Sequence, residues 1–357
     1  MLPKTFDEPE STVIENKAQL VDYLAAGCKS AEQFKLGSEQ EMFVFSGEDY
    51  RPVAYDGPEP GIRALLEGMT RFGWQTIHEG GLPIALSREG CTITLEPGGQ
   101  FEFSGAALRD AHQTQAETQA YREELGLLAG ELGLRFLAMG YQPKHPRAEL
   151  PWMPKERYKL MQAYMPRRGS LGLEMMQSTC AIQITTDFAD EADMIRKFRV
   201  ALALQPIVIA LFANSPFVNG RVGDYLSYRA AIWSDTDPDR CGSLPFVFEN
   251  GMGFERYTDY VLDVPMYFVL REGRYIDATG LSFRDFMQGR LSVLPGQVPL
   301  LSDWVSHLST VFPQVRLKQY LELRGADAGD TGNRVPALVA LWAGLLYDTQ
   351  VLEEAWD

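Results

Sequence analysis

Glutamates on short strand-like segments are the residues of this sequence best suited to chemistry. Glu39 and Glu41 lie in KLGSEQEMFVF, Glu96 and Glu102 in TITLEPGGQFEFSG, and Glu322 in RLKQYLELRGAD. Because residues two apart on a strand point to the same face, Glu39 and Glu41 share a face. Carboxylates gathered on one sheet face repel one another and resist desolvation. A hard cation such as Mg²⁺, shared with a phosphate, would stabilise them, although a single glutamate on a strand is most often a solvated surface residue.

Composition narrows the classes of partner. The chain has 357 residues, 45% of them hydrophobic, which is enough for one large core or two. Its net charge of −15 argues against nucleic acid and against an anionic membrane surface. The longest apolar run, over residues 201–213, is too short to span a bilayer and contains Pro206. We therefore expect small-molecule partners, with no nucleic acid and no membrane, in a monomer or homodimer.

Cysteine usage and the first residues predict the compartment. Cys28, Cys91, Cys180 and Cys241 are scattered, with no CxxC pair that would indicate a zinc site. The opening MLPKTFDEPEST is polar and lacks the apolar core of a targeting segment. Reduced thiols and a cytoplasmic location are the expectation.

Periodicity and turn residues predict the elements that must position the glutamates. Helices are predicted over residues 13–26, 60–72, 107–132, 190–212 and 336–347. Strands are predicted over 34–45, 84–88, 91–96, 100–104, 135–139, 177–186 and 315–324, with a hairpin over 266–277. Tight glycine turns such as Pro97-Gly98-Gly99 favour a mostly antiparallel sheet, so we expect an α+β fold rather than a doubly wound one.

The amino-acid sequences of these segments and their order resemble those of the plant-type glutamate–cysteine ligases of plants and many proteobacteria. The resemblance runs from about Lys35 to Asp348 through KLGSEQE, LEPGGQFEFSGA, YMPRRGSLGLEMM, ALALQPIVIALFANSPF, DVPMYF and YLELRGAD. It implies a single catalytic domain over residues 1–357. It also implies a curved, mostly antiparallel sheet, flanked by helices and related to the glutamine-synthetase fold, that forms the active-site cradle. Relatives continue past residue 348 with a further helical segment, which we expect to be absent or truncated here.

The resemblance also implies a reaction and its metal ligands. ATP would phosphorylate the side-chain carboxylate of glutamate, and the amine of cysteine would displace the phosphate, the first step of glutathione synthesis. By their place in the family motifs, Glu39, Glu41, Glu96, Glu102 and Glu322 would hold Mg²⁺ or Mn²⁺. The sequence has no GxxxxGK[ST] phosphate loop, so metal ions and cationic side chains must hold the ATP phosphates.

Cations and neutral polar groups complete the expected site. In the family, the arginine matching Arg229 grips the glutamate carboxylate, and Trp233 lies one helical turn further on. Arg324, beside Glu322, is expected to organise an ion pair or contact phosphate, so Arg229 and Arg324 are the predicted catalytic residues. Two further groups are expected in the site. Lys155, Arg157 and Lys159 of MPKERYK would contact ATP phosphates, and Thr179 and Gln183 would contact substrate, although a solvated basic loop and a filler glutamine are the plain alternatives.

The chain departs from its relatives at places that bear on the acceptor. Gln40 and Met42 replace polar and basic residues, and Ser178 replaces an arginine. The family's redox-switch cysteines correspond to Ala278 and Val293, so that switch should be absent. Two alternatives therefore stay open: a γ-glutamyl ligase with another amine acceptor, and a non-catalytic homologue.

Overall fold

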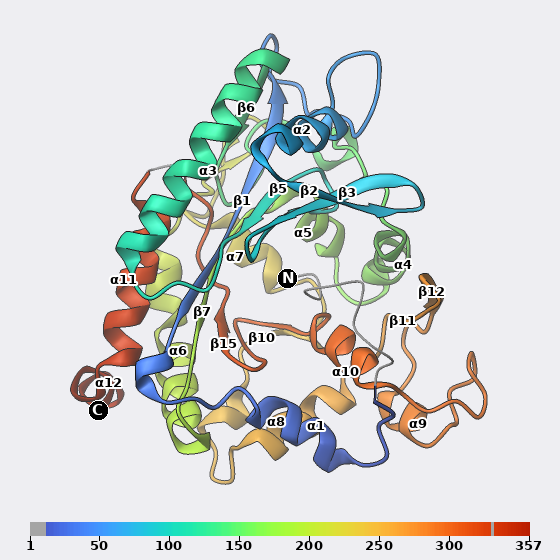
Figure 1. Cartoon of the computed structure of the whole chain (residues 1–357), viewed down its shortest axis with the longest axis vertical. Helices are drawn as coiled ribbons and strands as arrows, with labels where there is room; N and C mark the ends of the chain where they lie inside the picture. The colour runs from blue at the N-terminus through green and yellow to red at the C-terminus, as the bar shows by residue number, and fades with distance from the viewer. Residues whose placement is uncertain (1–11, 330–331) are drawn as a thin grey trace.

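One large antiparallel sheet organises the molecule. The structure is a computed structural model that describes residues 12–329 and 332–357. Eight strands follow the order β14-β15-β7-β1-β5-β4-β3-β2, and β6 pairs with the far end of β1. Their bounds are β1 Leu36–Ser46, β2 Gln75–Glu79, β3 Leu82–Arg88, β4 Cys91–Leu95, β5 Phe101–Ser104, β6 Leu134–Leu137, β7 Ile182–Thr186, β14 Val315–Leu317 and β15 Leu321–Leu323. The sheet twists strongly, so β2 and β3 run across Figure 1 while β1 and β7 run along it.

Small two-stranded pairs and helices surround this sheet. The pairs are β8 Phe217–Val218 with β9 Arg221–Val222, β10 Cys241–Gly242 with β13 Phe312–Pro313, and β11 Phe268–Arg271 with β12 Arg274–Asp277. The helices are α1 Lys17–Ala25, α2 Ile62–Met69, α3 Ala111–Leu132, α4 Glu156–Tyr164, α5 Gly172–Ser178, α6 Glu191–Leu211, α7 Tyr228–Trp233, α8 Phe254–Asp263, α9 Phe283–Met287, α10 Leu301–Leu308, α11 Arg334–Tyr347 and α12 Thr349–Trp356. The predicted α+β fold with a mostly antiparallel sheet is confirmed.

One face of the sheet is apolar and covered by helices. Met42 lies opposite Phe101, and Phe103 opposite Ile93, so these side chains share a face. The ring of Tyr121 on α3 stacks on Phe103 with 4.2 Å between ring centroids. Figure 1 shows α3, α11 and α6 side by side along this face. The other face is therefore free to carry polar groups.

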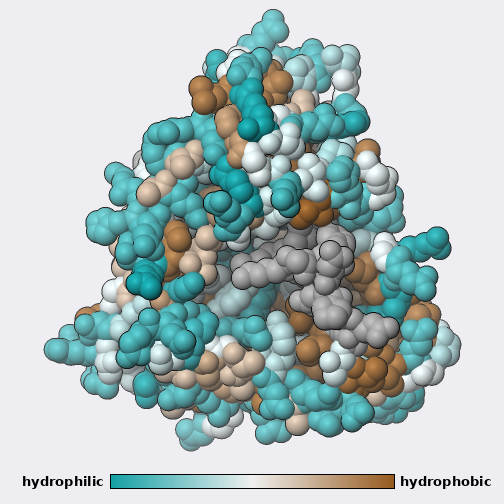
Figure 2. All heavy atoms as spheres, viewed as in Figure 1, coloured by the Kyte–Doolittle hydropathy of each residue, from teal (hydrophilic) through white to brown (hydrophobic). Residues whose placement is uncertain are grey.

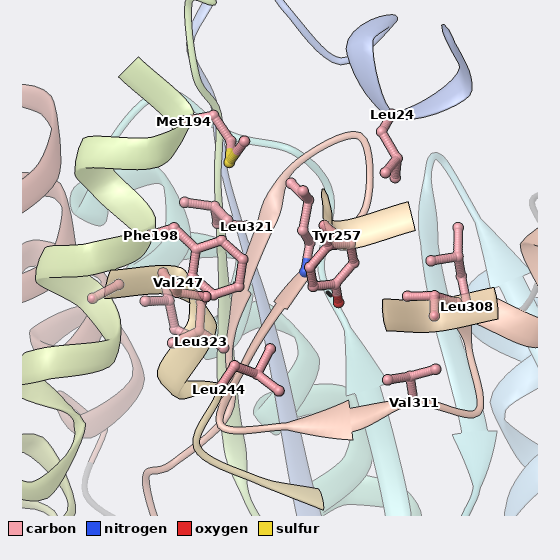
Figure 3. Close-up of a cluster of buried hydrophobic side chains, with 14 of the residues drawn as sticks. Leu24, Met194, Phe198, Leu244, Val247, Tyr257, Leu308, Val311, Leu321 and Leu323 are labelled. Carbon is pink, nitrogen blue, oxygen red and sulfur yellow. Dashed lines mark hydrogen bonds between the residues drawn. The ribbon is translucent and has the colours of Figure 1, made fainter. Parts of the chain in front are cut away.

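A second apolar cluster fills the lower half of the molecule. Figure 3 shows Phe198 of α6 and Leu321 and Leu323 of β15 converging around Tyr257 of α8. The Tyr257 hydroxyl accepts a hydrogen bond from the backbone N–H of Leu317 at 3.1 Å, which gives this buried polar group a partner. Outside, the face in Figure 2 is mostly hydrophilic, as an acidic chain predicts.

Two predicted strands are wrong in part, and both errors have a physical cause. Residues 177 and 178 end the helix α5, because Gln100 donates its side-chain amide to the carbonyls of Met176 and Thr179 at 3.1 and 3.0 Å. The predicted strand over 315–324 is a tight hairpin, β14 and β15, which turns at residues 318–320. Local periodicity cannot show the first feature, which depends on contact with a distant segment. It also cannot show the second, because this turn contains no glycine or proline.

Within the described ranges, no single helix is long and apolar enough to cross a bilayer; α11 and α12 together meet the length and composition criteria, but they are bent by 86°.

Candidate active site

The polar face of the sheet brings the predicted glutamates together. Glu41 lies directly opposite Glu102, and Glu39 lies opposite Gln183. Glu322 lies opposite Arg316 on one side and Thr185 on the other. Because residues opposite each other in antiparallel strands share a face, five strands (β1, β5, β7, β14 and β15) contribute to one polar surface.

A pocket that is partly open to solvent lies over this surface. Glu39, Glu41, Glu96 and Glu102 line its sheet side. The facing wall comes from α4, α5, α7, β11 and the 309–312 loop, and it contributes Arg157, Tyr158, Met161, Met175, Met176, Arg229, Trp233, Phe268, Ser309, Thr310 and Phe312. The pocket has the mixed polar and apolar lining of a small-molecule site.

Burial and mutual repulsion make the carboxylates of Glu39, Glu41 and Glu102 hard to ionise. Burial, then the neighbouring Glu102 and Glu96, hold the pKa of Glu41 well above its usual range. Burial and Glu96 likewise raise the pKa of Glu102, although Thr94 donates to its Oε2 at 2.9 Å. Burial, followed by Glu102 and Glu322 among its neighbours, raises the pKa of Glu39. A cation placed among these oxygens would remove the repulsion.

Carboxylate oxygens are suitable ligands for a divalent cation, but these carboxylates do not form a preassembled metal site. Glu41 also accepts hydrogen bonds from the backbone N–H of Ala181 at 2.8 Å and from Gln183 at 3.3 Å. Among the residues that the structure describes, no three Asp, Glu, His or Cys side chains form a ready-made metal cage. A cation would therefore have to draw the carboxylates closer together.

Glu322 lies in a different electrostatic environment. It is fully buried and pairs with Arg316 at 2.5 Å, Arg324 at 2.8 Å and Lys318 at 3.3 Å. Burial opposes its ionisation, but the three cations outweigh burial and hold its pKa well below the usual range. Glu322 is thus ionised and already neutralised, unlike Glu41 and Glu102.

Arg229 and Trp233 lie on one face of α7, as predicted, and both line the pocket. The Arg229 guanidinium donates to the backbone carbonyls of Arg324 and Gly325 at 3.0 and 3.1 Å. Its carbon Cζ lies 5.8 Å from the centre of the Trp233 ring. The arginine is therefore oriented before any ligand arrives.

The three predicted phosphate contacts separate in the structure. The segment that carries them begins the helix α4 and is not the loop given as the alternative, so successive side chains point in different directions. Arg157 lines the pocket, whereas exposed Lys159 pairs with Glu156 at 2.9 Å. Lys155 is buried beside the pocket and donates to the Leu95 carbonyl at 2.8 Å. Burial and the charge of Arg157 lower the pKa of Lys155 to about 8.

Residues that sequence reasoning missed surround the predicted ones. Arg316 lines the pocket, and Lys318 is buried beside Glu322. Both lie in the same RLKQYLELR string, where alternating basic residues before a strand glutamate are the available signal. Gln183 and Thr179 line the pocket as expected, and Arg324 donates to Gln183 as well as to Glu322.

Buried carboxylates on an antiparallel sheet share this pocket with Arg157 and Arg229, a combination suited to a small anionic molecule bound together with a cation. Comparison with known proteins gives the family: the profile of glutamate–cysteine ligase family 2 (GCS2) matches residues 35–357, so the chain belongs to this family. It is 50% identical to the chloroplastic glutamate–cysteine ligase of Brassica juncea over 355 residues, 99% of this chain and 68% of that protein. The corresponding enzyme of Solanum lycopersicum is 52% identical over 356 residues, 99% of this chain and 67% of that protein.

Solved structures are more distant. A bifunctional glutathione synthetase from Pasteurella multocida aligns with 97% of this chain and 42% of that chain, at a TM-score of 0.43 and 12% identity. Ligand-free GmaS aligns with 96% of this chain and 59% of that chain, at 0.36 and 14%. At these scores nothing about this chain follows from either structure.

The expected cytoplasmic location is contradicted by these relatives. The similar enzymes from Brassica juncea, Medicago truncatula, Solanum lycopersicum and Arabidopsis thaliana are all named chloroplastic. The polar opening residues and scattered cysteines are therefore a poor guide to the compartment.

Proposed function

We propose that the protein is an ATP-dependent glutamate–cysteine ligase that forms γ-glutamylcysteine through γ-glutamyl phosphate. The observation that carries this proposal is the pocket itself, whose lining combines Glu41, Glu96 and Glu102 with Arg229 and Arg157. Family membership over residues 35–357 supports the same reaction. The catalytic unit proposed is the whole chain.

The reaction must bring two anions together, the carboxylate of glutamate and the γ-phosphate of ATP. Bound among Glu39, Glu41, Glu96 and Glu102, Mg²⁺ or Mn²⁺ would supply the positive charge that lets these anions meet. Arg229 binds the substrate's carboxylate, because a planar guanidinium offers paired donors to two carboxylate oxygens. Arg324 and Arg157 both line the pocket and would contact the transferring and leaving phosphates.

No side chain needs to form a covalent bond in this scheme. ATP transfers its γ-phosphoryl group to the glutamate side chain, and the amine of the acceptor then attacks the acyl phosphate and releases phosphate. Positioning and charge stabilisation supply the catalysis. Glu322, already neutralised by three cations, holds Arg316 and Arg324 in place at the pocket wall.

Cysteine is the proposed acceptor, and the position of Ser178 supports it. The arginine that relatives carry at this position could have bound the acceptor's carboxylate. Ser178, however, is fully buried at the end of α5 and is not part of the pocket lining, whereas Thr179 is. The substitution therefore lies behind the site rather than within it.

The test is to incubate the protein with ATP, Mg²⁺ and glutamate, and to supply cysteine together with a panel of simple amines. Release of ADP with a product of the mass of γ-glutamylcysteine supports the proposal. Preferential ligation of an amine without a carboxylate would replace it with the alternative of a different γ-glutamyl ligase. Absence of any turnover in a metal-loaded, folded protein would favour the non-catalytic homologue.

A further inference from the structure

Asp327 lies outside the pocket lining but is connected to the start of the helix that carries Arg229. Asp327 is 1% exposed. Its Oδ2 accepts hydrogen bonds from the hydroxyl of Ser215 at 2.6 Å and from the backbone N–H of Asn214 at 2.9 Å. Its Oδ1 accepts from the hydroxyl of Ser227 at 2.9 Å. A single carboxylate thus fixes two segments that meet at α7.

Both serines pass this constraint to α7. The Ser215 hydroxyl oxygen accepts a hydrogen bond from the backbone N–H of Arg229 at 3.2 Å. Ser227 is the N-terminal capping residue of α7, and its hydroxyl oxygen accepts from the N–H of Ala230 at 3.2 Å. The backbone at Arg229 is therefore held by two hydroxyl groups, each of which is oriented by Asp327.

The side chain of Arg229 is held by the same segment. Its guanidinium donates to the carbonyls of Arg324 and Gly325, three and two residues before Asp327. Residues 324–327 therefore fix both ends of one arginine. Burial lowers the pKa of the Arg229 guanidinium, and the nearby negative charge of Asp327 opposes this lowering.

The segment that holds Arg229 is itself rigidly placed. Ile182 donates its N–H to the Ala326 carbonyl at 3.2 Å, and Ala328 donates to Cys180 at 3.1 Å. A Cβ atom at Gly140 would lie 2.3 Å from the Asp327 side chain, so only glycine permits this close backbone approach. Ala181, which lies between Cys180 and Ile182, donates its N–H to Glu41. Residues 180–182 therefore connect the segment that holds Arg229 to the carboxylate side of the pocket.

We propose that Asp327 is a positioning residue for glutamate binding, which fixes the location and direction of Arg229 without touching the substrate. This inference rests on the proposed function, since it takes glutamate as the ligand of Arg229. It assigns to Asp327 an effect on glutamate affinity that exceeds its effect on ATP affinity.

The test compares Asp327→Asn with wild-type protein by calorimetric titration of glutamate and by steady-state kinetics. The amide keeps the shape of the carboxylate, but its N–H group points at hydrogen-bond donors that the carboxylate oxygen accepted from. We therefore expect the Kd and KM for glutamate to rise about tenfold. The KM for ATP should stay within about twofold, because Arg229 is assigned to glutamate and not to ATP. Asp193→Asn is the matched control: Asp193 is a buried aspartate on α6, paired with Lys197 at 2.8 Å, and its loss should lower the melting temperature without changing glutamate binding.

If Asp327→Asn fails to fold, Ser215→Ala tests the same link, because it removes only the hydroxyl that joins Asp327 to the Arg229 backbone. Unchanged glutamate Kd in the folded variant, or equal increases in the KM of glutamate and ATP, would overturn the inference, as would wild-type protein that binds no glutamate. A wild-type protein that binds glutamate but makes no γ-glutamylcysteine would remove the proposed function alone, since the titration still measures the role of Asp327.

Discussion

Glu41 on β1 and Glu102 on β5 lie directly opposite each other in the central sheet, and both are buried. Two carboxylates placed in this way cannot both ionise cheaply, and the pKa of each is raised. Glu322, two strands away from β1, has the opposite shift in pKa because it is surrounded by Arg316, Lys318 and Arg324. The same residue type on the same face therefore has two different electrostatic roles.

The first prediction concerns the charge of Glu41. Glu41→Gln should lower turnover at least about a hundredfold, because loss of metal-bound charge costs several kcal/mol at the transition state. The metal-free variant should nevertheless melt at a higher temperature than the wild type, since a glutamine has neither a charge to desolvate nor a proton to take up on folding. The measurements are turnover with saturating Mg²⁺ and thermal melting after chelation; unchanged turnover would contradict the role of Glu41 as a metal ligand.

The raised pKa values of Glu41 and Glu102 also predict how stability depends on pH. A carboxyl whose pKa is higher in the folded state stays protonated there after it has ionised in the unfolded chain. Its contribution to stability is therefore lost as pH rises from the unfolded value of about 4.3 through the folded value. The melting temperature of metal-free protein should fall across this window, and Mg²⁺ should restore it with release of protons. Glu41→Gln should show a smaller fall, and an identical pH profile for both proteins would refute the assignment.

The third prediction separates Glu322 from Glu41. Glu322→Gln should destabilise folding by about 3–5 kcal/mol, because buried Arg316 and Lys318 and half-buried Arg324 would lose their common partner. Denaturant unfolding measures this change. A variant as stable as wild type would contradict the role of Glu322 as the counter-charge of these three cations.

The fourth prediction concerns Arg229. Arg229→Lys should raise the KM for glutamate about tenfold and change the KM for ATP much less, because an ammonium cannot reproduce a bidentate fork. The lysine would also be unable to keep both of the hydrogen bonds to backbone carbonyls that orient the guanidinium. A selective loss for ATP would reverse the assignment of Arg229.

The fifth prediction compares two cations of α4. Arg157 lines the pocket, whereas Lys159 is exposed and paired with Glu156. Arg157→Ala should raise the KM for ATP about tenfold, the scale of one charged hydrogen bond. Lys159→Ala is the matched variant one half-turn away and should leave this KM nearly unchanged. An equal effect of both would indicate long-range charge rather than direct binding.

Some features of this protein are determined by the sequence itself. The two-residue period of a strand is local, so the string GSEQEMFVF by itself places Glu39 and Glu41 together and Met42 opposite. The glycine turns between β4 and β5 are also local, and they predict the antiparallel pairing of these strands correctly. The four-residue spacing of Arg229 and Trp233 is enough to place both on one helical face.

Other features depend on which distant segments meet. Nothing in the local sequence pairs Glu41 with Glu102 rather than with a neighbour, because strand register is set by packing of the whole apolar face. Residues 177 and 178 form a helix end because Gln100 reaches across from another turn. The tertiary structure alone also decides the ionised state of Glu322 and the hydrogen bonds through which Asp327 positions Arg229. Burial and opposite charge act through space and not along the chain.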